Sequence, residues 1–350
     1  MGSQDDIYML RCLQLASNGI SDTAPNPMVG CVIVHNDTII GEGYHQRCGF
    51  PHAEVNAINS VKAENESLLP ESTLYVNLEP CSHYGKTPPC SQLIITKKIK
   101  RVVIGMSDPN EKVNGNGIEQ LRKAGIDVTV GVLEQQCRQL NRRFITFQTK
   151  KRPYVILKWA QTADGMIDAL RTDASTPPIR ISNDFTKKTN HQLRTQEAAI
   201  LVGTRTALLD NPHLTVRKWV GRNPVRICID RTLKLPTDSH LMDDSTPTLI
   251  FTEKQCANLT HTEFIQTDFT NNLAQQILDE LYRRQLTSMI VEGGTKTLQL
   301  FIDSDLWDEC RIETGAMRLN ADGIKAPEIK MKVTDIHFYG QQKIEIGIPL

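Results

Sequence analysis

One histidine and two cysteines constrain this chain most strongly, because they form a metal-ligand set. His52 begins the run His52-Ala53-Glu54, and Cys81 and Cys90 bound a proline-containing loop. One neutral imidazole and two thiolates can hold a zinc ion and leave its fourth position open for water. The three side chains must then meet at one point, which favours a fold with loops converging at strand-to-helix turns.

The spacing also indicates a chemistry. Zinc held by these ligands lowers the pKa of a bound water toward ~7. Glu54, two residues after His52, would take the water's proton and deliver it to departing ammonia. The pattern predicts a hydrolytic deaminase of an amino-substituted pyrimidine or purine, with Glu54 as the catalytic residue and His52, Cys81 and Cys90 as metal ligands.

Two other interpretations compete with a catalytic zinc. The site could be a closed structural one with His83 as fourth ligand, or the cysteines and histidine could be unpaired core residues. Glu54 and the Pro80-Cys81 context have no role in a closed site, which favours catalysis. Eight residues separate Cys81 from Cys90, whereas the generic deaminase pattern has two.

Local sequence places the ligands at helix starts. Gly49-Phe50-Pro51 interrupts the chain before His52, and residues 53–58 are typical of a helix. Thr87-Pro88-Pro89-Cys90 predicts a second helix start, with Thr87 as the cap and prolines where missing N–H groups do no harm. Two helix N-termini near the metal would favour thiolates and hydroxide.

Composition excludes several classes of protein. The 350 residues include 40 basic and 40 acidic side chains, so we expect no nucleic-acid partner. Nine cysteines without a disulfide-like rhythm favour a reducing, cytoplasmic location. The N-terminus lacks a positive region followed by an apolar run, so no signal peptide is expected. No apolar stretch of about eighteen residues exists, so no membrane partner is expected either.

The first half alternates between strand and helix patterns. Helices are predicted at residues 6–18, after His52 and at 117–124, and strands at 29–35, 38–41, 73–78, 101–104 and 126–130. This alternation predicts an α/β domain with a mixed or parallel sheet covered on both faces.

A basic segment, residues 139–153, separates this pattern from a second one. It could be a nucleic-acid-binding arm, but its short length favours a solvated inter-domain connection. Strands then follow at 154–159, 199–202, 225–229, 248–251 and 288–291, with helices at 184–194 and 272–284. We expect two α/β domains, residues 1–148 and 151–350.

The second half contains a candidate anion site. Glu292-Gly293-Gly294-Thr295-Lys296 follows an apolar run and opens a predicted helix, an arrangement that suits a phosphate. No complete Gly-x-Gly-x-x-Gly occurs, so a Rossmann domain is not supported. Arg194 and Arg217 could clamp a substrate phosphate, although spacing alone favours ordinary surface ion pairs.

Together the two halves resemble, essentially end to end, the bifunctional pyrimidine deaminase/reductase family of riboflavin biosynthesis. The motifs that carry the resemblance in the first half are Pro25-Asn26-Pro27-Met28-Val29-Gly30, Gly43-Tyr44-His45, His52-Ala53-Glu54, Glu79 through Cys90, and Asp108-Pro109-Asn110 with Gly115-Asn116-Gly117. In the second half they are residues 158–165, 202–217 and 291–294. The long spacing between the two cysteines is this family's own form.

The resemblance implies a fold and a pair of activities. The first domain would be a cytidine-deaminase-like three-layer domain, and the second a domain with the dihydrofolate-reductase fold. The first would deaminate a diamino-ribosylamino-pyrimidinone phosphate at a zinc ion. The second would use NADPH to reduce the ribosyl group to ribityl. The partner is therefore a small molecule, and a homo-oligomer is compatible with the resemblance.

The resemblance also assigns residues by position. Asn26 and His45 would contact the pyrimidine side of the deaminase substrate, and His83 and Lys86 would lie near its phosphate. The reductase residues expected to contact NADPH are Ala160, Arg180, Thr206, Asp210, Gly294, Thr295 and Lys296. Those expected to contact its substrate are Lys158, Pro178, Arg194, Leu214, Arg217 and Glu292. Lys158 or Glu292 could protonate or polarise the sugar oxygen.

Two residues depart from the family pattern. The family usually has Ser-x-Trp-Ile-Ser where this chain has Pro178-Ile179-Arg180-Ile181-Ser182. Pro178 lacks a hydroxyl, whereas Arg180 can still stack on a ring or pair with a phosphate. A second hypothesis therefore makes the C-terminal half a non-catalytic nucleotide-binding or regulatory module. A third is a nucleic-acid base deaminase that uses the basic segment.

Overall fold

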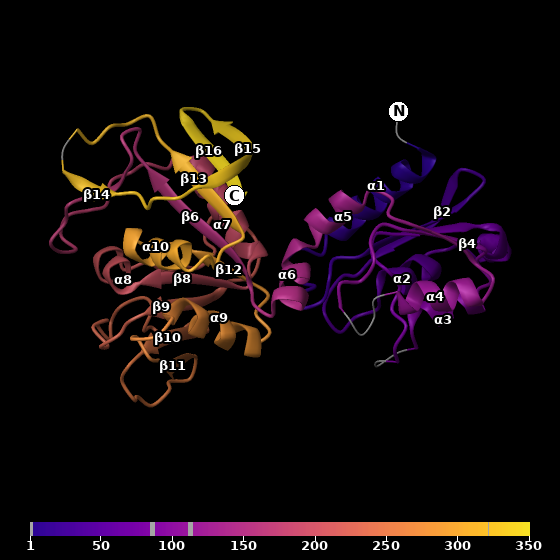
Figure 1. The fold of residues 1–350 in the computed structure, drawn as a ribbon, viewed down its shortest axis with the longest axis horizontal. Coiled ribbons are helices and arrows are strands. Elements are labelled where there is room, and N and C mark those ends of the chain that lie inside the picture. The colour runs from indigo at the N-terminus through magenta and orange to yellow at the C-terminus, as the bar shows by residue number, and fades with distance from the viewer. Residues whose placement is uncertain (1–2, 85–87, 111–114, 321) are drawn as a thin grey trace. The chain divides into compact units, whose positions relative to one another are not determined.

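The chain folds into two compact units, Met1–Lys151 and Arg152–Leu350, shown with their elements in Figure 1. The coordinates are those of a computed structural model, which describes all residues except 1–2, 85–87, 111–114 and 321. Each unit is described by itself.

The first unit consists of one sheet with helices on both faces. Its elements are α1 (Gln4–Ser17), β1 (Gly30–His35), β2 (Thr38–Tyr44), α2 (Ala53–Asn59), the 3₁₀ helix η1 (Ala63–Glu71), β3 (Thr73–Val76), α3 (Cys90–Thr96), β4 (Arg101–Ile104), α4 (Asn116–Lys123), β5 (Asp127–Val130), α5 (Glu134–Leu140) and α6 (Arg142–Lys150). The strand order is β2-β1-β3-β4-β5. β1 is antiparallel to β2 and β3, and β3, β4 and β5 are parallel.

Alternate side chains of these strands supply two cores. Cys31, Ile33 and Leu74 pack with α2, α3 and α4 on one face. Val32 and Tyr75 pack with α1 and α5 on the other. Because successive strand residues point to opposite faces, both faces of an apolar strand must be covered. The predicted doubly covered mixed sheet is confirmed, and the ligand-bearing helices α2 and α3 share one face.

Two local predictions for this unit were wrong. The strand predicted at 73–78 ends at Val76; Asn77 instead uses its side chain to accept from Gly30 N at 2.7 Å and to donate to Met28 O at 3.0 Å. The segment 139–153 contains the boundary between the two units, at Lys151 and Arg152, but it is not solvated along its length. It is largely the helix α6, and Asn141 and Phe147 are buried. Arg142, Arg143 and Lys150 lie within this amphipathic, packed helix, and Arg143 is buried in it.

The second unit is built around a larger sheet. Its elements are β6 (Tyr154–Gln161), β7 (Met166–Ala169), α7 (Asp184–Gln196), β8 (Ala199–Gly203), α8 (Thr204–Asp210), β9 (Val225–Ile229), β10 (Thr248–Thr252), β11 (Thr262–Gln266), α9 (Leu273–Arg283), β12 (Ser288–Val291), α10 (Thr295–Asp303), β13 (Glu309–Thr314), β14 (Gly323–Lys325), β15 (Met331–Tyr339) and β16 (Gln342–Pro349). The sheet order is β11-β10-β9-β8-β12-β6-β13-β16-β15, with β14 and β7 in a separate pair.

The strands from β11 to β13 in this order are parallel, and β16 is antiparallel to both of its neighbours. Val155 and Leu157 of β6 pack with α9 and α10, whereas Ile156 packs on the other face with α7 and α8. The five strands predicted from apolar runs all exist. The C-terminal strands β13, β15 and β16 were not predicted. Of these, β15 is exposed along most of its length and lacks an apolar run.

The parallel arrangement decides where chemistry can occur. Carboxyl ends of adjacent parallel strands lie at one edge of the sheet, where loops can form a ligand site. The ends of β6, β8 and β12 carry Gln161, Gly203 and Val291, next to the residues predicted to bind cofactor and substrate. Among the helices that the structure describes, none combines the length and apolarity needed to cross a bilayer.

Candidate functional site

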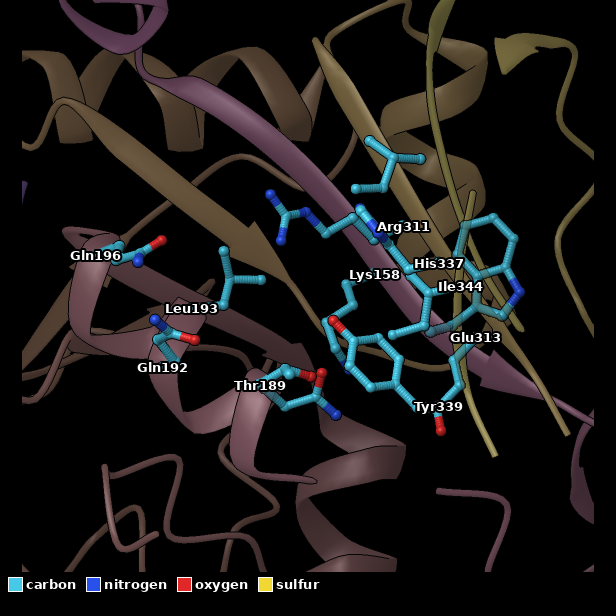
Figure 2. A pocket seen from close by; sticks show the side chains of 13 residues that line it. Lys158, Thr189, Gln192, Leu193, Gln196, Arg311, Glu313, His337, Tyr339 and Ile344 are labelled. Carbon is cyan, nitrogen blue, oxygen red and sulfur yellow. The ribbon is translucent and has the colours of Figure 1, made fainter. Parts of the chain in front are cut away.

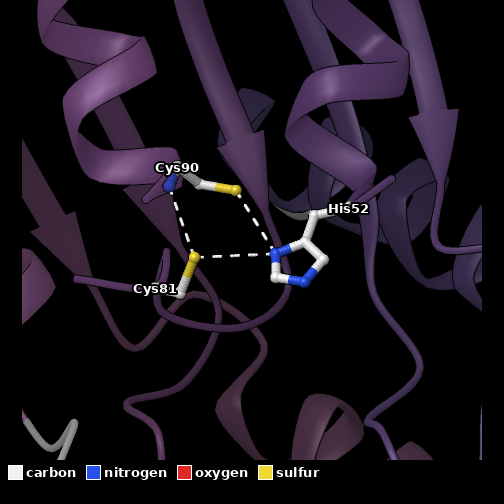
Figure 3. A group of neighbouring side chains, drawn as sticks. All are labelled: His52, Cys81 and Cys90. Atoms are coloured by element: carbon white, nitrogen blue, oxygen red, sulfur yellow. Dashed lines mark hydrogen bonds between the residues drawn. The ribbon is translucent and has the colours of Figure 1, made fainter. Parts of the chain in front are cut away.

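The three predicted zinc ligands meet at two helix starts (Figure 3). His52 is the residue immediately before α2, and Cys90 is the first residue of α3. His52 Nδ1 lies 3.5 Å from Cys81 Sγ and 3.4 Å from Cys90 Sγ. Tetrahedral zinc, with Zn–S of about 2.3 Å and Zn–N of about 2.0–2.1 Å, would separate nitrogen and sulfur by roughly 3.5 Å. The donor atoms therefore already have the spacing that zinc requires.

Hydrogen bonding within this group prepares a thiolate. The amide of Cys90 donates to Cys81 Sγ at 3.3 Å. Hydrogen bonds from the Cys90 thiol and from His52 outweigh the effect of burial and lower the pKa of Cys81 to about 4. The hydrogen bond with Cys81, followed by burial, raises the pKa of Cys90. A divalent ion bound by both sulfurs would displace their protons, because zinc takes cysteine as thiolate.

Glu54 lies in the first turn of α2 and is only 3 % exposed. Burial, followed by the charge on Cys81, raises the pKa of its carboxyl to about 7. A carboxyl with such a pKa can take up and release a proton near neutral pH. The positive charge of a bound zinc would act in the opposite direction and favour the carboxylate. Glu54 is therefore a buried carboxyl beside Cys90 with a pKa near neutral, and its role as a proton shuttle stays a prediction.

Asn26 and His45, both predicted to contact substrate, lie beside the ligand group. The amide nitrogen of Asn26 is 3.2 Å from His45 Nε2, and His45 Nδ1 is 3.1 Å from Pro51 O. The His45 ring meets the His52 ring edge-on, with centroids 5.6 Å apart. A carbonyl beside Nδ1 requires the proton there, so Nε2 accepts from Asn26. Burial lowers the pKa of His45, which keeps this ring neutral.

His83 is not part of the ligand group. It is exposed, and among the described residues the candidate metal cluster here contains only His52, Cys81 and Cys90. This arrangement favours an open zinc site over the closed one with His83 as fourth ligand. Lys86 and the predicted helix cap Thr87 lie outside the described residues.

Glu79 organises the loop next to the cysteines, a role that the sequence did not reveal. Its buried carboxylate accepts from the amides of Asp108, Gly115, Gly117 and Ile118 at 2.9 to 3.3 Å. A Cβ added to Gly117 would come within 2.1 Å of Pro80 O, so only glycine fits there. The signal in the sequence that could have indicated this role is the position of Glu79, directly after a predicted strand and two residues before Cys81.

In the second unit, three predicted substrate residues from distant segments form a charge network. Lys158 Nζ of β6 lies 3.2 Å from Glu292 Oε1, and Arg194 Nη2 of α7 lies 2.8 Å from Glu292 Oε2. Glu292 follows β12, which is paired with β6, so its position beside Lys158 is fixed by strand register. Burial alone would raise the pKa of Glu292, but the charges of Arg194 and Lys158 outweigh it and hold the pKa at about 2.

Arg217 is placed by a residue that the sequence did not single out. The amide of Arg217 donates to His191 Nδ1 at 3.0 Å. Burial, followed by the charges of Arg194 and Arg217, lowers the pKa of His191 to about 4, so its ring stays neutral with Nδ1 as an acceptor. His191 lies one helical turn before Arg194 on α7. It therefore joins the α7 charge network to the loop containing Leu214 and Arg217.

A pocket of about 190 Å³ lies beside this network, between α7 and strands β6, β13, β15 and β16. Figure 2 shows Lys158, Arg311 and Glu313 on its strand side and Thr189, Gln192 and Gln196 on its helix side. Glu313 is buried and accepts from Ser182 Oγ at 2.7 Å. Lys158 thus lines the pocket and also pairs with Glu292.

The glycine turn before α10 has the features of an anion site. Gly294 caps α10 without a side-chain hydrogen bond, and its amide donates to Thr206 Oγ1 at 3.1 Å. Gly203 packs against Thr297: a Cβ added at Gly203 would lie only 2.3 Å from the Thr297 hydroxyl oxygen. First-turn amides that no side chain caps favour a phosphate. Thr295 Oγ1 donates to Lys325 O, and Lys296 is exposed.

The remaining predicted reductase residues lie in different environments. Asp210 pairs with Arg171 Nη2 at 2.5 Å, so its charge is already compensated. Ala160 lies on β6, two residues beyond Lys158. Leu214 is buried in the core between the sheet and α7, so a contact with substrate would have to use its main chain. Pro178 and Arg180 are exposed in the irregular segment before α7.

Comparison with known proteins agrees with this division. Residues 2–106 match the cytidine and deoxycytidylate deaminase zinc-binding region, and residues 153–319 match the RibD C-terminal domain. The chain is 38 % identical to the riboflavin biosynthesis protein RibD of Aquifex aeolicus over 340 residues, covering 94 % of this chain and 93 % of that one. It is 41 % identical to RibD of Synechocystis over 297 residues, covering 83 % and 78 %.

Solved structures show the same relationship. A crystal structure from Thermotoga maritima, of a diaminohydroxyphosphoribosylaminopyrimidine deaminase/5-amino-6-(5-phosphoribosylamino)uracil reductase, has a TM-score of 0.90, 38 % identity and 99 % coverage of each chain. RibD of Acinetobacter baumannii has a TM-score of 0.87, 28 % identity and the same coverage. The predicted fold class, a cytidine-deaminase-like domain followed by a reductase domain, is confirmed. The chain belongs to the RibD family of bifunctional riboflavin biosynthesis enzymes, with a zinc-binding deaminase domain followed by a reductase domain.

Proposed function

We propose that this chain carries out two consecutive steps on one small molecule. The first is zinc-dependent hydrolytic deamination of a diamino-ribosylamino-pyrimidinone phosphate, and the second is NADPH-dependent reduction of its ribosyl group to ribityl. The observation that carries the proposal is the spacing of 3.4 and 3.5 Å from His52 Nδ1 to the two sulfurs, beside the buried Glu54. The substrates named for the Thermotoga enzyme support the choice of molecule.

In the deaminase domain, His52, Cys81 and Cys90 would hold the zinc ion. A bound zinc ion would polarise a water molecule and lower its pKa. Glu54 would accept a proton from that water and deliver it to the leaving amino group, because its carboxyl is buried and lies beside Cys90. Neutral His45, fixed by Pro51 O and by Asn26, would contact the pyrimidine. His83 and Lys86 would approach the phosphate.

In the reductase domain, bound NADPH would supply the hydride. Gly294, Thr295 and Lys296 would hold a cofactor phosphate at the start of α10, and Thr206 fixes the turn through Gly294 N. Ala160, Arg180 and Asp210 would contact the remainder of the cofactor.

Lys158 is the better candidate for protonating the sugar oxygen. Glu292, with a pKa of about 2, is ionised at neutral pH and has no proton to give. Lys158 Nζ is a hydrogen-bond donor, and it is held 3.2 Å from Glu292. Arg194 and Arg217 would bind the substrate phosphate, with Leu214 and Pro178 at its margin.

We also propose a homo-oligomer in a reducing, cytoplasmic setting. Strand β15 lies at the edge of its sheet, and Val333, Ile336 and Phe338 on it are exposed. An exposed edge strand favours pairing with another chain. All nine cysteines are free, which supports the setting. Light scattering of the purified chain at several concentrations tests the assembly.

Product mass spectrometry tests the two activities together. Zinc-loaded protein is incubated with the diaminopyrimidine ribosylamino phosphate, with and without NADPH. We expect one amino group to be replaced by oxygen in both samples, and a gain of two hydrogens only with NADPH. Deamination without reduction would support the alternative of a regulatory second domain. Failure to deaminate with zinc bound would contradict the catalytic role of the site.

A further inference from the structure

A second cluster of potential metal ligands lies in the reductase domain, between the loop after α8 and the connection from β9 to β10. It consists of His213, His240 and Asp243, whose ligating atoms all lie within 4.8 Å of one another. The two imidazole rings are stacked, with centroids 3.5 Å apart and planes 21° apart. The deaminase and reductase chemistry proposed above uses none of the three side chains.

We propose that His213, His240 and Asp243 form a binding site for a divalent transition metal, separate from the deaminase zinc. Two imidazoles and one carboxylate suit zinc, nickel, cobalt or copper, whereas magnesium and calcium prefer oxygen ligands. The site would join the loop after α8 to the connection between β9 and β10. The inference is independent of both proposed reactions.

The surrounding hydrogen bonds leave one carboxylate oxygen available. Arg226 Nη2, Ser245 N and Ser245 Oγ all donate to Asp243 Oδ1, at 3.0, 3.1 and 2.8 Å. These three donors orient the carboxylate through a single oxygen. A ligand carboxylate fixed by outer hydrogen bonds is the usual arrangement at a metal site. Because the three hydrogen bonds to Oδ1 fix the orientation of the carboxylate, they also fix the position of Asp243 Oδ2, the oxygen that would bind the ion.

The main chain around His240 is held just as firmly. His240 N donates to Asn211 Oδ1 at 2.8 Å, and His240 O accepts from Arg226 Nη1 at 2.6 Å. Arg226 is fully buried and also bonds to Thr246 O and to Thr248 Oγ1. One buried arginine therefore holds the main chain of His240 and the side-chain carboxylate of Asp243, which reduces the ordering that metal binding requires.

The two imidazole rings must reorient before both can coordinate one ion. Lone pairs in two nearly parallel rings do not converge. Binding therefore requires the rings to turn about their Cβ–Cγ bonds, and both histidines are partly exposed, which leaves room for this rotation. Loss of the stacked arrangement is part of the proposal.

The nearby cations restrict the affinity. Arg226 already compensates Asp243, and the charge of Arg217 also acts on His213. A divalent ion must bind against these charges, so we expect weaker binding here than at the two thiolates of the deaminase centre. The deaminase centre can therefore be filled with zinc first, and the weaker site can then be titrated with a second metal.

Calorimetric titration of nickel into the zinc-loaded, tag-free full chain tests the proposal. We expect one nickel ion per chain with the zinc content unchanged. His213→Gln and His240→Gln should each weaken binding at least about tenfold, because even outer-sphere partners of metal ligands contribute about 10–100-fold. The matched control is His261→Gln, an exposed histidine of the same domain, which should leave binding unchanged.

A second variant separates ligation from folding. Asp243→Asn keeps an oxygen for Arg226 and Ser245 but removes the negative charge, and it too should weaken nickel binding. Circular dichroism checks that each variant is folded. The proposal is overturned if the wild type binds no nickel beyond its zinc, if His213→Gln and His240→Gln bind as tightly as the wild type, or if magnesium binds as well as nickel.

Discussion

Glu292 should contribute more to the stability of the reductase domain than any exposed ion pair. Its carboxylate pairs with Lys158 at 3.2 Å and with Arg194 at 2.8 Å, and its side chain is only 16 % exposed. The pKa falls from 4.5 to about 2, a difference worth roughly 3–4 kcal/mol at about 1.4 kcal/mol per pKa unit. Breaking a buried pair by removing one partner typically costs about 3–5 kcal/mol. We therefore expect Glu292→Gln to destabilise this domain by roughly 3 kcal/mol.

Urea unfolding followed by tryptophan fluorescence measures this loss. The three tryptophans, Trp159, Trp219 and Trp307, all lie in the second unit, so their signal follows the reductase domain alone. The matched control is Glu253→Gln, which removes an exposed pair with Arg231 and should cost at most about 1 kcal/mol.

The dependence on pH has a definite sign. Because folding depresses the pKa of Glu292, its contribution is fully present above the unfolded pKa and is lost as the pH falls through the folded one. The wild type should therefore lose its advantage over Glu292→Gln between about pH 4.5 and pH 2. An equal free energy of unfolding for the two proteins at pH 7 would refute the reasoning, as would an advantage that grows on acidification.

Three further substitutions test the sites separately. Glu54→Gln should lower the deamination rate by about 10²–10⁴-fold, while zinc content and reductase activity stay unchanged. Normal deamination in this variant would exclude Glu54 as the proton shuttle. Gly117→Ala places a Cβ within 2.1 Å of Pro80 O and should cost about 1–3 kcal/mol with loss of zinc, measured by thermal unfolding and metal content. Lys123→Ala, at an exposed position on α4, is its control, and equal zinc retention would contradict the packing argument. His191→Ala should raise KM for the phosphorylated reductase substrate about tenfold or more, because it leaves the Arg217 amide without its acceptor. His191→Asn, which can still accept that hydrogen bond, should retain most of the affinity. Equal KM values in the two variants would contradict a positioning role for His191.

Local sequence was sufficient where a feature depends on neighbouring residues. His52, Cys90 and Glu54 lie at helix starts marked by prolines and glycines, and helix geometry over one turn fixes their direction. The central strands of both sheets are short apolar runs, which are recognisable without knowledge of their neighbours. In the segment 139–153 the many charges conceal an amphipathic helical period, in which Phe147 is buried.

The sequence by itself was enough for the α/β fold class and the family, and it predicted the ligand set. The tertiary structure decided what those residues do to one another. Glu292 reaches Lys158 through the register of β12 with β6, Glu79 fixes a loop some thirty residues away, and His213 stacks on His240. These contacts join segments far apart in the chain, so their distances and pKa values are set by strand pairing and burial, which no local pattern of residues encodes.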